Sequence, residues 1–128
     1  MKPAHFAAAL AILLLVTTGA TAQDQHNQQF NDHDRQVTQG WYNQHQKNAP
    51  RGMRSSDRLT PAEEQRMQPG QPYDRQLQQR SHSVPTDLRR QLPPAPRNHK
   101  YVAVGQHVAL VDTVNNVLRD VIHLHGQH

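Results

Sequence analysis

The stretch that decides the fold is KYVAVGQHVALVDTVNNVLRDVIHLH, residues 100–125. Val, Ile, Leu and Tyr dominate it, and these residue types favour extended structure. They gather in three runs with turn-forming residues between them: 100–104, 107–112 and 117–124. The pattern therefore predicts three strands, joined in sequence order as an antiparallel meander.

Two short links connect the predicted strands. Gly105 and Gln106 form a two-residue link with glycine in the first place, which favours a type II′ hairpin. Residues 113–116 form the second link, and its asparagines tolerate the left-handed geometry of a turn. The predicted fold class is α+β: a small C-terminal three-stranded antiparallel meander with one or two short helices.

The part of the chain before this stretch is polar. The protein has 128 residues, 34% of them hydrophobic, no cysteine and a formal net charge of +4. Between residues 23 and 100, only 15 of 78 residues are hydrophobic. Such a segment buries too little apolar surface to offset its ordering entropy. We therefore predict a mostly flexible Gln/Asn-rich arm over 23–83, a folded module over 84–125 and a tail over 126–128.

One helix is predicted near 32–46, at the start of this arm. Asn31 or Asp32 can cap it, and Val37 with Trp41 forms a thin apolar stripe at helical spacing. A stripe this thin does not hold a helix in isolation. Docking of Trp41 on the C-terminal module, or on a partner, accounts for its presence.

A second short helix is predicted near 61–67. Thr60 and Glu63 have the spacing of a capping box, in which each side chain bonds the backbone of the other. The remaining stretches of the arm, 43–58 and 68–80, carry few apolar residues, and we expect them to be largely irregular.

The first 22 residues read as a targeting segment. Lys2 supplies a positive charge, residues 6–16 form an apolar run, and Ala20 and Ala22 give a small-x-small pattern. This order predicts a secretory signal peptide cleaved after Ala22, and hence an exported protein. The run is shorter than the ~20 residues of a membrane span, so no integral span is expected after cleavage. Without cysteine, neither disulfides nor thiolate metal sites are available.

Four segments resemble the RcnB-like periplasmic family. The Pro-rich entry and the Gly-centred hairpin carry most of the likeness: LPPAPRNHKYVAVG (92–105), VALVD (108–112) and VLRDVI (117–122). The segment FNDHDR (30–35), ahead of Trp41 and Tyr42, is similar to members described as CigR-like.

This resemblance implies two different roles on one module. The name-giving member of the family is implicated in nickel and cobalt homeostasis alongside an efflux system. The CigR-like branch is described as antivirulence regulators. The resemblance therefore implies fold and compartment more firmly than activity, because one fold hosts several functions.

Catalysis and nucleic-acid binding are not expected. The sequence has no Gly-rich phosphate loop and no HExxH motif, and no supporting turn surrounds Ser81, His82 and Ser83. Glu63 and Glu64 stand in the first turn of a capped helix, where acids are favoured electrostatically. Lys and Arg are scattered singly among acids and glutamines, so no basic face for nucleic acid is predicted.

Histidine is the unusual residue of this chain, with 10 in all. Neutral imidazole is a good ligand for nickel, cobalt, copper or zinc. The densest group ends the chain, with His123, His125 and His128, and side chains alternate along a strand, so the first two share a face. A polar, frayed strand end explains the same residues without a metal. His33, between two aspartates, is a weaker second candidate that a helix cap explains better.

The strand register decides whether His107 joins this group. A four-residue loop at the second link places His107 opposite Ile122, on the face away from His123 and His125. A three-residue loop places it opposite Val121, on their face, because one residue of slip exchanges the faces of a strand. We predict the three-residue loop, since three converging imidazoles make a better metal site than two.

Two function classes follow. The first is a periplasmic protein of metal homeostasis, which binds nickel or cobalt without catalysis or modulates an efflux system. The second is a non-catalytic envelope interaction module of the CigR type, with no metal role.

Overall fold

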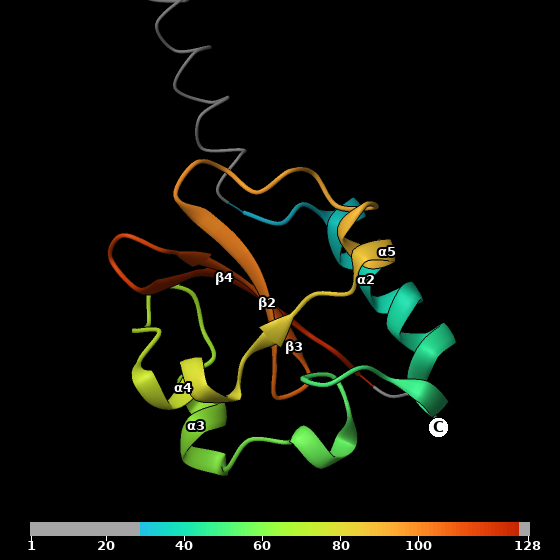
Figure 1. Ribbon diagram of the computed structural model, residues 1–128, viewed down its shortest axis with the longest axis horizontal. Coiled ribbons are helices and arrows are strands. Elements are labelled where there is room, and N and C mark those ends of the chain that lie inside the picture. Colours follow the sequence, from blue (N-terminus) through green and yellow to red (C-terminus); the bar gives the residue numbers. More distant parts are fainter. Residues whose placement is uncertain (1–28, 126–128) are drawn as a thin grey trace, which may run out of the picture.

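The computed structural model describes residues 29–125, and Figure 1 shows its arrangement. The helical segments in this range are α2 (Asp32–His45), η1 (Gln46–Asn48), η2 (Ser55–Asp57), α3 (Pro61–Gln65), α4 (Arg75–Arg80) and α5 (Thr86–Arg89). The strands are β1 (His82–Ser83), β2 (His99–Val104), β3 (His107–Asp112) and β4 (Val117–His123). The predicted signal peptide at 1–22 and the tail at 126–128 lie outside the described residues.

The strands form one antiparallel sheet in the order β1-β2-β3-β4. The α+β class and the predicted meander are therefore confirmed. A fourth strand, β1, extends the meander through the pairs His82↔Ala103 and Ser83↔Val102. The sequence does not predict this strand, because two residues are too few to show the alternation of apolar and polar side chains typical of a strand. Within residues 29–125, no helix has the length and apolar character needed to cross a bilayer.

The first hairpin differs from the predicted type II′ turn. Both Gly105 and Gln106 take left-handed angles, with φ of +56° and +66°, which is typical of type I′. The Gln106 backbone N–H donates to the carbonyl oxygen of Gly52 at 2.9 Å, so a distant loop holds this geometry. A Cβ atom at Gly105 would lie 2.2 Å from Cγ of Leu59, and only glycine fits there.

The predicted three-residue loop of the second hairpin is wrong. Asp112 pairs with Val117, which leaves a four-residue loop between them. A continuous ladder from that pair would place Leu110 opposite Arg119, yet Leu110 pairs with Asp120. Arg119 is therefore the extra residue of a β-bulge, which shifts the rest of β4 by one position.

Contacts outside the hairpin hold the bulge in place. Leu118 donates its backbone N–H to the carbonyl of Gln71 at 2.9 Å and accepts from the N–H of Gly70 at 2.7 Å. Within the hairpin, the Arg119 guanidinium also donates to the Asp112 carboxylate at 2.9 Å. The bulge thus depends on the segment before α4, which covers this edge of the sheet.

Both faces of the sheet are covered, and Figure 1 shows α2 with α5 on one side and α3 with α4 on the other. Under α2 and α5, the buried apolar cluster consists of Phe30, Trp41, Tyr42, Ala49, Met53, Val84, Leu88, Leu92, Ala103, Val108, Leu110, Ile122 and Leu124. Under α3 and α4, it consists of Leu59, Met67, Tyr73, Leu77, Val102, Val104, Ala109, Val111, Leu118 and Val121. The sheet is the middle layer of three.

The expectation of a mostly flexible arm before residue 84 is wrong for residues 29–83. This segment supplies large side chains to both clusters, among them Met53, Met67 and Leu77, which are fully buried. Most of its few apolar residues are spaced so that they join the clusters on the sheet, whereas their overall count suggested that none would. Residue 84 is therefore not a boundary of the core.

The predicted helices of this segment are largely confirmed. Asn31 caps α2 and Thr60 caps α3, each in a capping box. Trp41 docks on the folded module, as one of the two alternatives proposed, and its indole N–H donates to the Asp87 carboxylate at 3.0 Å. The expectation of an irregular 68–80 missed α4, whose N-cap is Asp74.

Candidate functional site

His107 and His123 lie side by side on the face of the sheet that α3 covers. They begin β3 and end β4, and they are direct partners across the ladder. Their ring centroids are 4.7 Å apart and the rings meet edge to face at 78°. The bulge at Arg119 creates this pair, because either regular register would place His107 opposite Val121 or Ile122.

Glu64 of α3 completes the group from above the sheet. Its Oε1 lies 2.8 Å from Nε2 of His107 and 3.8 Å from Nδ1 of His123. One donor atom from each of the three side chains lies within 4.8 Å of the others. Within residues 29–125, these three side chains form the one group of at least three His, Asp or Glu donors with metal-binding spacing.

The two neighbouring acids of α3 have different tasks. Glu63 is buried, bonds the backbone N–H of Thr60 at 2.9 Å and pairs with Arg80 at 3.2 Å. The Thr60 backbone N–H holds the pKa of Glu63 below its usual value, against the opposing effect of burial. Glu64 takes no part in the capping box, so its carboxylate is free to reach the histidines.

The hydrogen bonds of His107 fix which of its nitrogens faces the site. Its Nδ1 lies 3.1 Å from the carbonyl oxygen of Val104, and a carbonyl only accepts, so Nδ1 carries the proton. The neutral ring then presents an acceptor, Nε2, to the Glu64 carboxylate at 2.8 Å. Two acceptors at this distance need a positive charge between them, either a proton or a metal ion. Metal-ligating histidines commonly have such a backbone carbonyl on the other nitrogen.

The surroundings of the two imidazoles differ. Only 4% of the His107 side chain is exposed, against 45% for His123. Burial lowers the pKa of His123 from its usual value, and the neighbouring His107 adds to the effect. A lowered pKa keeps the imidazole neutral, which is the form that binds metal.

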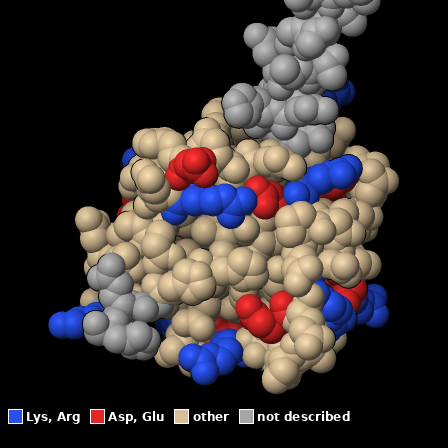
Figure 2. Space-filling view, turned by 180° about the vertical axis from the view of Figure 1, so that it is seen from behind, with Lys and Arg blue, Asp and Glu red and all other residues tan. Residues whose placement is uncertain are grey.

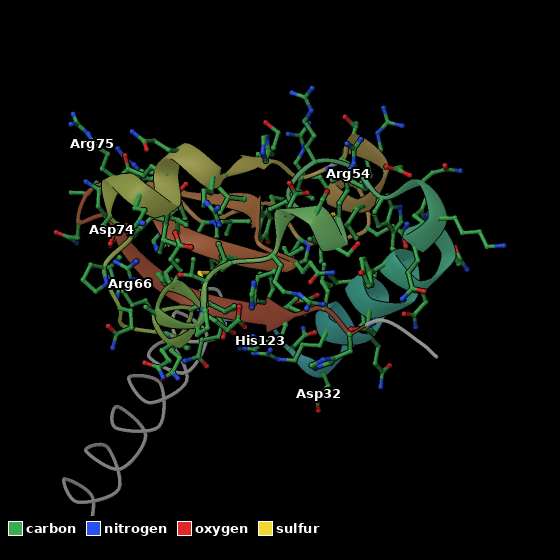
Figure 3. The ribbon with its side chains drawn as sticks, turned by 90° about the horizontal axis from the view of Figure 1, so that it is seen from below. Asp32, Arg54, Arg66, Asp74, Arg75 and His123 are labelled. Carbon is green, nitrogen blue, oxygen red and sulfur yellow. The ribbon has the colours of Figure 1, made fainter. Side chains whose placement is uncertain are left out.

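The group stands at the wall of a cavity of about 420 Å³. Residues of the η2–α3 link, the first hairpin and the end of β4 line this cavity, namely Arg58, Leu59, Pro61, Glu64, Gly105, Gln106, His107, His123, Leu124 and His125. Figure 3 shows His123 near the end of β4, apart from the Arg66, Asp74 and Arg75 side chains. The side chains of His123 and Glu64 are about half exposed, so the site is reached from solvent.

The structure places the predicted metal residues in different environments. His107 and His123 lie on one face of the sheet, as predicted. The β-bulge brings them together, and not the predicted three-residue loop. His125 lines the cavity but is not one of the three clustered donors, and its backbone N–H and C=O pair with the Gln39 side chain. His128 lies outside the described residues. His33 is exposed on α2 and belongs to no such cluster in the described range.

Glu64 is a residue of the site that the sequence did not predict. Helix electrostatics accounts for both acids of α3, and a contact across 43 positions has no local signature. One signal was present in the sequence. The capping box needs Glu63 alone, so the acid that follows it has no capping role.

Charge on the surface is mixed. Figure 2 shows basic and acidic side chains interspersed on one face, with uncharged residues between them. Several of the basic residues in the described range are paired with carboxylates, as Arg35 is with Asp120 and Arg80 with Glu63. This face shows no extended basic surface of the kind that nucleic acid requires.

Comparison with known proteins gives a likeness in fold. The C-terminal domain of inner membrane protein CigR from Salmonella enterica superposes with a TM-score of 0.53 at 20% identity, covering 73% of this chain and 92% of that domain. No family profile and no curated protein sequence matches the chain. The likeness supports the CigR-like side of the resemblance at the level of fold.

Proposed function

We propose that this protein is an exported, non-catalytic envelope protein that binds a divalent transition metal, nickel or cobalt, at Glu64, His107 and His123. The observation that carries the proposal is the grouping of Glu64, His107 and His123, whose donor atoms lie within 4.8 Å of one another, with Nε2 of His107 2.8 Å from Oε1 of Glu64. A metal ion between them satisfies both atoms and gains His123 as a third ligand.

The donor set supports a transition metal over calcium or magnesium. Two imidazole nitrogens and one carboxylate suit nickel, cobalt, zinc or iron, whereas calcium and magnesium prefer oxygen alone. Nickel and cobalt are the metals implied by the resemblance to the RcnB-like family. The carbonyl of Val104 orients His107 and would raise its strength as a ligand.

The location in the envelope rests on two further observations. Residues 1–22 have the order of a secretory signal peptide, and the solved relative in fold is described as a domain of an inner membrane protein. In that compartment the protein buffers the ion or presents it to a membrane efflux system. No group in the site is arranged as a nucleophile with its base, so the proposal includes no chemical step.

Calorimetric titration of the purified protein with nickel, cobalt and zinc tests this proposal. We expect one ion per chain and release of protons, because the metal replaces the proton between His107 and Glu64. His123→Asn and Glu64→Gln each weaken binding at least tenfold, or about 1.4 kcal/mol. Both side chains are about half exposed, so neither variant disturbs the core.

His33→Asn is the matched control. It removes an exposed histidine on α2 that stands between two aspartates, and binding should be unchanged. A loss of binding in this variant alone would move the site to the start of α2. An absence of heat and of proton release with all three metals would refute the proposed function.

A CigR-type interaction module without a metal role is the second candidate. The likeness in fold to the CigR domain favours it. Its partner would be another envelope protein, and the contact of Glu64 with His107 would then be a proton-bridged pair that holds α3 on the sheet. The same titration separates the two candidates.

A further inference from the structure

The three protein ligands of the proposed ion come from two layers of the fold. Glu64 comes from α3, while His107 and His123 come from adjacent strands of the sheet. All three residues line the cavity of about 420 Å³, so a small ligand in this cavity lies next to the ion. Sites with three protein ligands keep open coordination positions, which water or a small ligand fills.

The charge of the loaded site favours an anion in these open positions. A divalent ion with two neutral imidazoles and one carboxylate leaves one net positive charge. His107 is buried, so solvent screens this charge incompletely. An anionic ligand from solution neutralises it, whereas water does not.

Arg58 adds a second positive charge to the same cavity. Arg58 is an exposed residue of the cavity lining, and it forms no ion pair with a carboxylate among residues 29–125. The guanidinium recognises planar carboxylates through two parallel hydrogen bonds. The apolar walls, formed by Leu59, Pro61 and Leu124, accommodate the carbon skeleton of such a ligand.

We infer that the protein takes its metal as a complex with a small polycarboxylate chelator, which completes the coordination sphere and is held by Arg58. The cavity volume lies in the range of small-molecule sites, roughly 300–1,000 Å³. This inference rests on the proposed function and names the form in which that site receives its ion.

Equilibrium dialysis with radiolabelled citrate tests the inference on the purified protein. Citrate is dialysed against metal-free protein, against protein loaded with one nickel ion, and against nickel-loaded Arg58→Gln and Arg75→Gln. Nickel retained with the protein is measured in the same samples. Arg75 is the matched control, because it is an exposed arginine on α4, away from the site.

We expect about one citrate per nickel-loaded chain and none above background on metal-free protein. Arg58→Gln lowers citrate affinity about tenfold while nickel retention without citrate is unchanged, and Arg75→Gln changes neither. Arg58 is exposed, so its replacement leaves the fold intact.

Three results overturn the inference. In the first, nickel stays on the protein but no citrate is retained. In the second, citrate removes nickel from the protein. In the third, Arg58→Gln and Arg75→Gln retain citrate equally. In all three, nickel binding without citrate leaves the proposed function standing, whereas protein that retains neither nickel nor citrate contradicts both.

Discussion

Asp120 and His107 are buried to a similar degree on opposite faces of the sheet, but their surroundings differ. Asp120, 5% exposed, lies under α2. Its carboxylate accepts hydrogen bonds from the backbone N–H of Phe30 at 2.8 Å, the Arg35 guanidinium at 2.8 Å and the N–H of Val121 at 2.9 Å. His107, 3% exposed, lies under α3, and its Nε2 meets another acceptor beside an open cavity.

This difference in hydrogen-bond partners indicates that Asp120 is a structural group, whereas His107 belongs to a binding site. Around Asp120 every near neighbour is a donor, so the charge is satisfied by the protein and holds α2 on the sheet. Around His107 the near neighbours are acceptors, so Nε2 needs either a proton or a bound cation to face the Glu64 carboxylate. Burial by itself does not distinguish the two groups. They differ in whether their hydrogen-bond partners are donors or acceptors.

The largest expected effect concerns the α2 face. Trp41→Ala removes a side chain that is 6% exposed and belongs to the apolar cluster under α2. We expect a loss of about 3–5 kcal/mol in the free energy of unfolding, measured by urea denaturation. A loss below about 1 kcal/mol would show that α2 contributes little to the fold, and hence that residues 29–48 behave as the flexible arm expected from composition.

A pair of matched acid-to-amide substitutions compares the two faces directly. Asp120→Asn removes a buried charge from its donors, and we expect a loss of about 2 kcal/mol in unfolding free energy without metal. Glu64→Gln relieves a contact between acceptors on a half-exposed side chain, and we expect a change within about 0.5 kcal/mol. Equal losses in the two variants would contradict the comparison.

The pH dependence of stability tests the environment of the α3 face further. Burial lowers the pKa of His123 in the folded protein below about 6.5, its value in the unfolded chain. The unfolded state then binds more protons, so this contribution is present above pH 6.5 and is lost as the pH falls through the folded pKa. Urea midpoints measured between about pH 7.5 and 5 should fall less in His123→Asn than in the wild type. Identical slopes in the two proteins would count against a lowered pKa of His123 in the folded protein.

The smallest expected effect concerns the C-terminal histidines. Truncation after Leu124 removes His125 and His128, which the sequence pattern offered as ligands. His125 lines the cavity but stands outside the cluster of donors, so nickel affinity should change less than about threefold, or 0.7 kcal/mol, in calorimetry. A tenfold loss of nickel affinity would show that His125 or His128 is a ligand.

Some features of the fold were predictable because their signals are local. The β-branched runs specified the three long strands, and each hairpin link lies where Gly105 and the asparagines at 115 and 116 indicated. The capping boxes at Asn31 and Thr60 involve residues three positions apart, so the sequence contains both partners within one helical turn.

The packing of residues 29–83 was not predictable by counting. A stretch with few apolar residues is flexible only if those residues find no common surface. Here Met53, Met67 and Leu77 each reach the sheet, and the sheet offers two apolar faces where the meander alone would expose both. The short edge strand β1 is likewise a product of this packing.

The candidate site shows where the limit of the sequence lies. The sequence by itself determined that His107 starts one strand and that His123 lies near the end of the next, since strand propensity and turn chemistry act within a few residues. The tertiary structure decided that they face each other and that Glu64 joins them. The pairing depends on the bulge at Arg119, which contacts from residues 70 and 71 hold, and the carboxylate reaches His107 across 43 positions. Such contacts form only when separate elements pack, because their energy comes from groups that the local sequence does not contain.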